Sequence, residues 1–162
     1  MIRHFFKKQK PSKKVSALIT KYKIPKAYLA INRKAVANAT FIGLFLAMMP
    51  MPFQMIAALL SMPFVKFNVP LSLTLVWVSN PFTLPFILYG EYQLGIFILG
   101  NESLGDMVLT VAWFQNNIDT IFVPLFTGAL IIGPVVATLG RYLILHLWRR
   151  SVHKERKSKN NQ

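Results

Sequence analysis

The sequence predicts an all-α integral membrane protein with a few helices, two proline-broken segments and a C-terminal transmembrane helix. Of its 162 residues, 54% are hydrophobic and 15% are charged, yet the net charge is +14. Residues 1–34 hold 11 Lys or Arg and residues 141–162 hold seven, whereas residues 35–140 hold one Lys and four acids. Charges gathered at the two ends of an apolar chain exclude an ordinary soluble domain, a disordered tail and a DNA-binding module.

The charge distribution divides the chain into three parts. A basic cytoplasmic or interfacial arm covers 1–34, a membrane domain covers 35–148 and a basic cytoplasmic tail covers 149–162. Segments rich in Lys and Arg stay in the cytoplasm, so both termini are predicted on that side. Residues 91–119 contain acids and no Lys or Arg, and they are expected on the opposite side.

The basic arm contains one helical signal. Val15, Leu18, Ile19 and Tyr22 follow the spacing of one helix face. A basic amphipathic helix of this kind binds an anionic membrane surface. The alternative is a solvated arm whose charges only set the orientation of the chain.

The first apolar stretch, residues 35–65, has no charged residue. Its 31 residues are enough to enter or cross a bilayer, for which about 20 are needed. Pro50 and Pro52 interrupt its centre, because proline removes a backbone donor and clashes with the preceding turn. Two half-helices over about 39–49 and 53–65 are therefore predicted, joined by a corner.

The second apolar stretch, residues 71–89, repeats this plan with a break over 79–85. Each break carries one amide side chain, Gln54 in the first and Asn80 in the second. Paired interruptions of this kind indicate discontinuous helices whose ends meet near the centre of the bilayer. The alternative is that the prolines only kink two ordinary helices.

The clearest transmembrane helix is predicted over 121–150, where it would be about 45 Å long at 1.5 Å per residue. In the simplest topology, 39–65 forms a broken, re-entrant hairpin, 71–89 crosses outward and 121–145 crosses back. The alternative lets the first stretch cross fully and needs an additional span near 92–118, which is less apolar.

Four motifs, in this order and spacing, resemble those of the bacterial membrane family called domain of unknown function 2062. The motifs are Phe41-Ile42-Gly43-Leu44-Phe45, Pro50-Met51-Pro52-Phe53-Gln54, Asn68-Val69-Pro70-Leu71 and Trp77-Val78-Ser79-Asn80-Pro81-Phe82-Thr83-Leu84-Pro85, followed by Tyr89 and Gly95. The last string is the specific one, and the likeness covers about residues 30–150. The resemblance implies a small, multi-pass protein of the bacterial inner membrane, and it supplies no activity and no functional residues.

Polar side chains within apolar stretches are costly and often functional. The helix ends at a break leave backbone donors and carbonyls unpaired, and Gln54 and Asn80 can complete a site for an ion or an anionic headgroup. The alternative is that each amide only caps the backbone freed by its neighbouring proline. The candidate ligand or pathway residues are Pro50, Pro52, Gln54, Asn80, Pro81, Thr83 and Pro85.

Three further residues, Glu91, Tyr92 and Arg141, are secondary candidates. Glu91 and Tyr92 are expected at a membrane edge, where the carboxylate is solvated. Arg141 is expected to reach the cytoplasmic interface beside Tyr142. The alternative places Arg141 inside the bundle, paired with Glu91 or with a phospholipid phosphate.

The predicted function is transport or permeation of a small solute, an ion or a lipid through a site at the broken helices. No catalytic constellation, phosphate-binding loop or zinc pattern occurs, and the chain has no Cys. We therefore expect no enzymatic activity, no metal, no cofactor and no nucleic-acid partner. Expected partners are the bilayer, anionic lipids at the basic ends, and a second copy or another membrane protein. The alternative function is a non-catalytic accessory or scaffold subunit for an envelope-building enzyme.

Overall fold

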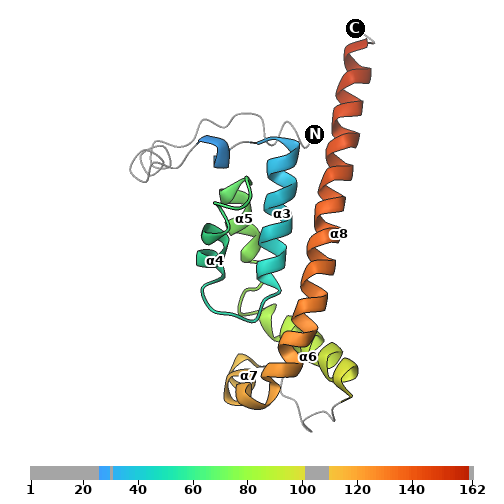
Figure 1. Ribbon diagram of the computed structural model, residues 1–162. Helices are drawn as coiled ribbons and strands as arrows, with labels where there is room; N and C mark the ends of the chain where they lie inside the picture. The colour runs from blue at the N-terminus through green and yellow to red at the C-terminus, as the bar shows by residue number, and fades with distance from the viewer. Residues whose placement is uncertain (1–25, 30, 101–109, 161–162) are drawn as a thin grey trace.

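The computed structural model describes residues 26–29, 31–100 and 110–160. Within these residues the chain is helical throughout, with one short 3-10 helix, six α-helices and no strand (Figure 1). The predicted all-α class is confirmed for this part of the chain. The elements are η1 (Lys26–Leu29), α3 (Arg33–Ala47), α4 (Gln54–Leu60), α5 (Val69–Val76), α6 (Leu84–Leu99), α7 (Val111–Asn116) and α8 (Ile118–Asn160).

Helices α3 and α8 lie side by side and run in opposite directions (Figure 1). Helix α3 begins after Asn32, whose side-chain Oδ1 accepts a hydrogen bond from the backbone N–H of Ala35 over 2.8 Å and so satisfies a free donor of the first turn. Glycines of α8 allow the two helices to approach closely. A Cβ atom placed on Gly140 would lie 2.3 Å from Cδ1 of Leu44.

After α3 the chain reverses, and α4 leads back toward the start of α3 (Figure 1). Asn38 Nδ2 donates to the carbonyl of Lys66 over 3.0 Å, and the backbone N–H of Asn68 donates to the carbonyl of Ala35 over 3.1 Å. Lys66 therefore lies at the same end of the molecule as the start of α3. The Asn68 side chain then caps α5 by accepting from the backbone N–H of Leu71.

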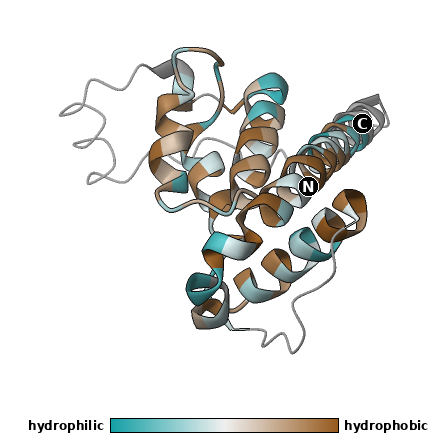
Figure 2. Cartoon of the chain, turned by 60° about the horizontal axis from the view of Figure 1, so that its bottom comes forward, coloured by the Kyte–Doolittle hydropathy of each residue, from teal (hydrophilic) through white to brown (hydrophobic). Residues whose placement is uncertain are grey.

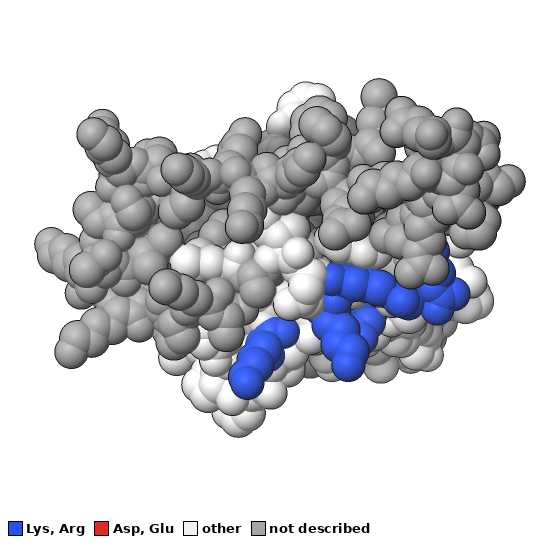
Figure 3. All heavy atoms as spheres, turned by 90° about the horizontal axis from the view of Figure 1, so that it is seen from above, with Lys and Arg blue, Asp and Glu red and all other residues white. Residues whose placement is uncertain are grey.

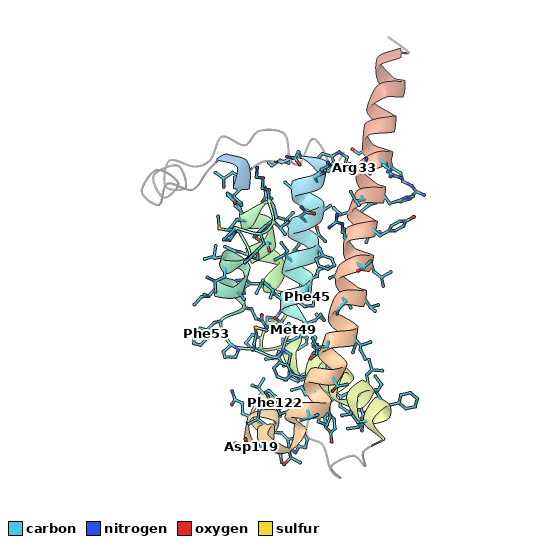
Figure 4. The ribbon with its side chains drawn as sticks, in the orientation of Figure 1. Arg33, Phe45, Met49, Phe53, Asp119 and Phe122 are labelled. Carbon is cyan, nitrogen blue, oxygen red and sulfur yellow. The ribbon has the colours of Figure 1, made fainter. Side chains whose placement is uncertain are left out.

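Helices α6 and α7 and the first turns of α8 form the opposite end of the molecule. Figure 4 places Asp119 and Phe122 at this end and Arg33 at the other. Helices α6 and α8 share a buried apolar cluster, and α7 packs beside it through Trp113. The cluster consists of Leu88, Tyr92, Ile96, Ile121 and Leu125.

Both proline breaks separate helices as predicted, but the predicted helix bounds were wrong by several residues. Helix α3 begins at Arg33, ahead of the predicted 39, because Asn32 provides a cap. Helix α4 ends at Leu60, ahead of the predicted 65, and a turn that contains Pro63 follows it. The helical face predicted over 15–22 lies outside the described residues.

One helix of the described part is long and apolar enough to cross a membrane, namely Ile118–Ser151 within α8. Helix α6 is apolar but shorter. Large apolar side chains are also exposed around the molecule, among them Phe64, Phe82 and Phe97, which are 86%, 81% and 83% exposed. Figure 2 shows hydrophobic residues along the helices.

Lys and Arg side chains gather at the end of the molecule where α3 begins. Figure 3 views this end and shows basic and no acidic residues among its described atoms. Exposed basic residues lie at the start of α3, after α4 and in the upper part of α8, where α8 passes the start of α3. These residues are Arg33, Lys34, Lys66, Arg149 and Arg150.

Candidate functional site

The two proline breaks are adjacent in space, and a side-chain hydrogen bond joins them. Ser79 Oγ, from the second break, donates to Gln54 Oε1 over 2.8 Å. On its other side, Gln54 Nε2 donates to the carbonyl of Met49 over 2.8 Å, before the first break. Gln54 therefore caps its own corner and also connects this corner to the next one.

Asn80 organises the second break locally. Its Oδ1 accepts from the backbone N–H groups of Phe82 and Thr83, over 2.9 and 3.1 Å. In return, the backbone N–H of Asn80 donates to Thr83 Oγ1 over 3.1 Å, and the Thr83 hydroxyl donates to the carbonyl of Val78. This reciprocal pattern satisfies donors that the turn before α6 leaves free. The Asn80 Oδ1 atom therefore caps backbone N–H groups beside Pro81, which was the alternative to a ligand-binding role in the sequence analysis.

A cavity of about 840 Å³ lies between the two breaks. This volume falls within the usual range for small-molecule sites. The first break, the start of α4, the end of α5, the second break, α7 and the first turns of α6 and α8 each contribute to its wall. The lining residues are Pro50, Met51, Pro52, Phe53, Gln54, Met55, Ile56, Val76, Trp77, Ser79, Asn80, Pro81, Leu84, Leu88, Val111, Gln115, Ile118 and Leu125.

Among the described residues, the lining is mainly apolar and contains no ionisable side chain. Its polar side chains are the amides of Gln54, Asn80 and Gln115 and the hydroxyl of Ser79. Apolar walls with a few polar groups are suited to a neutral or amphipathic molecule that needs orientation at one end. The lining offers few of the oxygen ligands that a dehydrated ion needs in place of its hydration shell.

Five of the seven candidate residues line this cavity: Pro50, Pro52, Gln54, Asn80 and Pro81. The other two support it from outside. Thr83 holds the turn of Asn80, and Pro85 is buried in the first turn of α6.

Several lining residues were missed by sequence reasoning, among them Trp77 and Gln115. Gln115 comes from a short helix far along the chain, and no local pattern connects it to the breaks. Trp77 is the first residue of the Trp77–Pro85 motif, so this motif was the sequence feature that could have identified it as a lining residue.

Phe53, at the first corner, has an uncommon backbone conformation. Its φ of 66° and ψ of 26° lie in the left-handed region, and it is the one non-glycine residue of the described part with positive φ. A bulky residue in this region costs of the order of 1–3 kcal/mol. The side chain is 74% exposed and lines the cavity. Strain of this kind, held at the wall of a cavity, is typical of functional sites.

Glu91 and Tyr92 are buried, so the prediction of a solvated carboxylate at a membrane edge was wrong. Their side chains are 0% and 2% exposed. The structure also contradicts a Glu91–Arg141 pair, because neither carboxylate oxygen of Glu91 has a hydrogen-bond partner and Arg141 is exposed. The sequence did contain a signal for this burial. Glu91 follows the buried Leu88 by three residues, so both lie on the same side of α6, and this side packs on α8.

The comparison with known families covers most of the chain. A family model described as "Uncharacterized protein conserved in bacteria (DUF2062)" matches residues 17–157. The chain belongs to this family. No curated protein and no solved structure matches the chain significantly.

The match to DUF2062 includes both proline breaks, the whole lining of the cavity and Glu91. The family description gives a bacterial distribution and no activity.

Proposed function

We propose that this DUF2062 protein is a multi-pass protein of the bacterial inner membrane that moves a small amphipathic molecule through the cavity between its two helix breaks. The observation that carries the proposal is the position of the cavity. Two broken segments, far from the ends of the chain, meet at one cavity and are joined by the Gln54–Ser79 hydrogen bond. Discontinuous helices that meet at a cavity are the recurring construction of substrate sites in transporters.

Residence in a membrane is supported by α8 and by the exposed apolar side chains. The apolar part of α8, Ile118–Ser151, is about 51 Å long at 1.5 Å per residue, which exceeds the hydrocarbon thickness of about 30 Å. Exposed side chains such as Phe64 and Phe97 form apolar surface that a soluble monomer rarely carries. Lipid would cover this surface.

The charges support an orientation with both ends of the membrane domain in the cytoplasm. Basic residues gather where α3 begins and where the upper part of α8 lies, whereas Asp119 lies at the opposite end (Figures 3 and 4). The positive-inside rule puts the basic end in the cytoplasm. Lys66 returns to this end, so the segment from α3 to Lys66 is proposed as a re-entrant hairpin, and α8 as a full crossing.

The test uses the full chain reconstituted in liposomes of phosphatidylethanolamine and phosphatidylglycerol. The probe is phosphatidylglycerol with a short acyl chain labelled by nitrobenzoxadiazole, and dithionite added outside reports its movement between leaflets. We expect the protein to accelerate this movement, and we expect Gln54→Ala to abolish most of the acceleration because it removes a polar group of the cavity and the link to Ser79.

Asn38→Ala is the matched control. It also removes an amide that donates to a backbone carbonyl, but at the basic end and away from the cavity. Entrapped carboxyfluorescein must stay inside, which excludes a general leak. Equal probe movement in wild type and Gln54→Ala, with both folded, would overturn the proposal. So would the absence of protein-dependent movement in the wild type, and a stoichiometric membrane partner in pull-downs would then favour the accessory-subunit alternative.

A further inference from the structure

Glu91 is the one acid in the described membrane domain that is completely buried. Its exposed fraction is 0%, and within the described part of the chain neither Oε1 nor Oε2 has a hydrogen-bond partner. Burying an unpaired carboxylate is strongly unfavourable, whereas the neutral acid is much cheaper to bury. The cavity described above does not include this residue, so its chemistry is still unassigned.

Glu91 lies where α6 and α8 cross closely, at the shortest glycine contacts of the described residues. A Cβ atom on Gly128 of α8 would lie 1.7 Å from the backbone carbonyl oxygen of Glu91. One turn further, a Cβ atom on Gly95 would lie 1.7 Å from the carbonyl oxygen of Pro124. The backbones of α6 and α8 are thus in contact here. Water can reach a charged Glu91 only if α6 moves away from α8.

The helices packed on α6 provide no counter-charge for Glu91. Helix α7 has no ionisable side chain, and α8 has none between Asp119 and Arg141. Both of these residues are exposed, and they lie about 13 and 20 Å along the axis of α8 from the crossing. The other ionisable groups on α6 are the hydroxyls of Tyr89 and Tyr92.

The crossing adjoins the cavity. Leu88 and Leu125 line the cavity, and both also belong to the buried cluster between α6 and α8. Leu88 lies three residues before Glu91, and Leu125 lies three residues before Gly128. Glu91 is therefore about one helical turn behind the wall of the cavity, and a movement of α6 that exposes Glu91 also moves this wall.

We propose that Glu91 is a proton-binding site that controls the cavity. When the carboxylate binds a proton from water, the neutral acid permits α6 to close on α8. When the acid releases the proton to water, the charge favours separation of the helices at Leu88 and Leu125. This proposal rests on the cavity of the proposed function, and it makes movement through that cavity dependent on protons.

A proton is the ligand that fits a closed site of this kind. It needs no space beyond the carboxyl group itself, and it needs no further ligands. A metal ion needs several donors, and no group of three or more His, Cys, Asp or Glu side chains among the described residues could hold one. An organic cation would need room that the backbone contacts at Gly95 and Gly128 exclude.

The test measures opening of the cavity wall directly and needs no transported molecule. Because the chain has no Cys, Leu88→Cys in the full chain in liposomes reports access of a water-soluble methanethiosulfonate reagent to the wall. Phe53→Cys, at an exposed position of the same cavity, corrects for the pH dependence of thiol reactivity. The ratio of the two modification rates is measured between about pH 6 and pH 9, with Glu91 and with Glu91→Gln.

With Glu91 present, we expect the rate ratio to rise about tenfold toward high pH, equivalent to about 1.4 kcal/mol in the opening equilibrium. With Glu91→Gln, which imitates the neutral acid, the rate ratio should stay at its low-pH value. If the Glu91→Gln protein does not fold, Glu91→Leu replaces it as the uncharged variant. A ratio independent of pH with Glu91, or an equal rise in both backgrounds, overturns the proposal. The lipid-movement assay with Gln54→Ala is independent of this result, so failure of either proposal is recognised separately.

Discussion

The crossing of α6 and α8 allows a strong test of the fold through a single methyl group. In Gly128→Ala the added Cβ atom would lie 1.7 Å from the carbonyl oxygen of Glu91, whereas real Cβ contacts are essentially never below 3.0 Å. The helices must therefore separate locally by about 1.3 Å. The obstacle is backbone, so no side-chain rotation can relieve the clash.

Overpacking of this kind costs about 1–3 kcal/mol. Gly90→Ala is the matched control on α6, because nothing lies within 4 Å of the position where its Cβ atom would be. Gly90→Ala should gain up to about 1 kcal/mol from helix propensity. Gly128→Ala gains the same propensity term, so the two variants should differ by the overpacking cost alone, about 2 kcal/mol, or roughly 4–8 °C in the midpoint of thermal unfolding for a chain of this size.

The assay is thermal unfolding of the purified protein in detergent, followed by tryptophan fluorescence. Gly90→Ala should unfold at or slightly above the wild-type midpoint, and Gly128→Ala below it. If both variants unfold at the same temperature, α6 and α8 do not touch through their backbones at Gly128, and the site around Glu91 is not closed.

Three further predictions concern the breaks and the topology. Asn80→Ala should lower the unfolding midpoint by an amount equivalent to about 1–2 kcal/mol, because two backbone N–H groups lose their acceptor; an unchanged midpoint contradicts the capping role. Phe53→Gly should leave stability equal or raise it by about 1 kcal/mol, since glycine adopts positive φ without strain; a large loss would show that the exposed ring is needed. Lys66→Cys and Asp119→Cys should react with a membrane-impermeant maleimide from opposite sides of the membrane, and reaction from one side refutes the orientation.

The positions of the breaks could be predicted from sequence because their cause is local. Pro50 and Pro52 lack the backbone donors that a continuous helix needs, and the second break has the same cause. The start of α3 was misplaced although a signal was present. Asn32 is a good N-cap, but the basic Arg33 and Lys34 that follow were assigned to the arm, and they form the first turn of the helix.

The contents of the site could be predicted only in part, because they depend on contacts between distant segments. Gln54 and Asn80 were identified by their place beside prolines, but nothing local shows that Gln54 bonds to Ser79. The burial of Glu91 was missed because the residue was judged by its position after an apolar stretch. The register of α6 gives its side of the helix, but that this side packs on α8 depends on residues such as Gly128, which lies 37 residues further along the chain.

The glycine contacts also indicate how the cavity can change shape. At Gly43, an added Cβ atom would lie 2.7 Å from the backbone oxygen of Ser72, so α3 and α5 are held together through backbone, as are α6 and α8. Between these two pairs, by contrast, the contact of α3 with α8 at Gly140 is with the flexible end of Leu44. Within each pair the described glycine contact is thus with backbone, whereas the contact between the pairs at Gly140 is with a side chain.

The cavity takes part of its wall from each of these pairs, with Val76 on α5 and Leu88 on α6. A movement of one pair relative to the other would change the cavity, and so would the separation of α6 from α8 that is proposed for a charged Glu91. The segment that links them is the second break, where Ser79 donates to Gln54. This hydrogen bond spans the two corners, so its loss in Gln54→Ala should affect movement through the cavity more than it affects the packing of either pair.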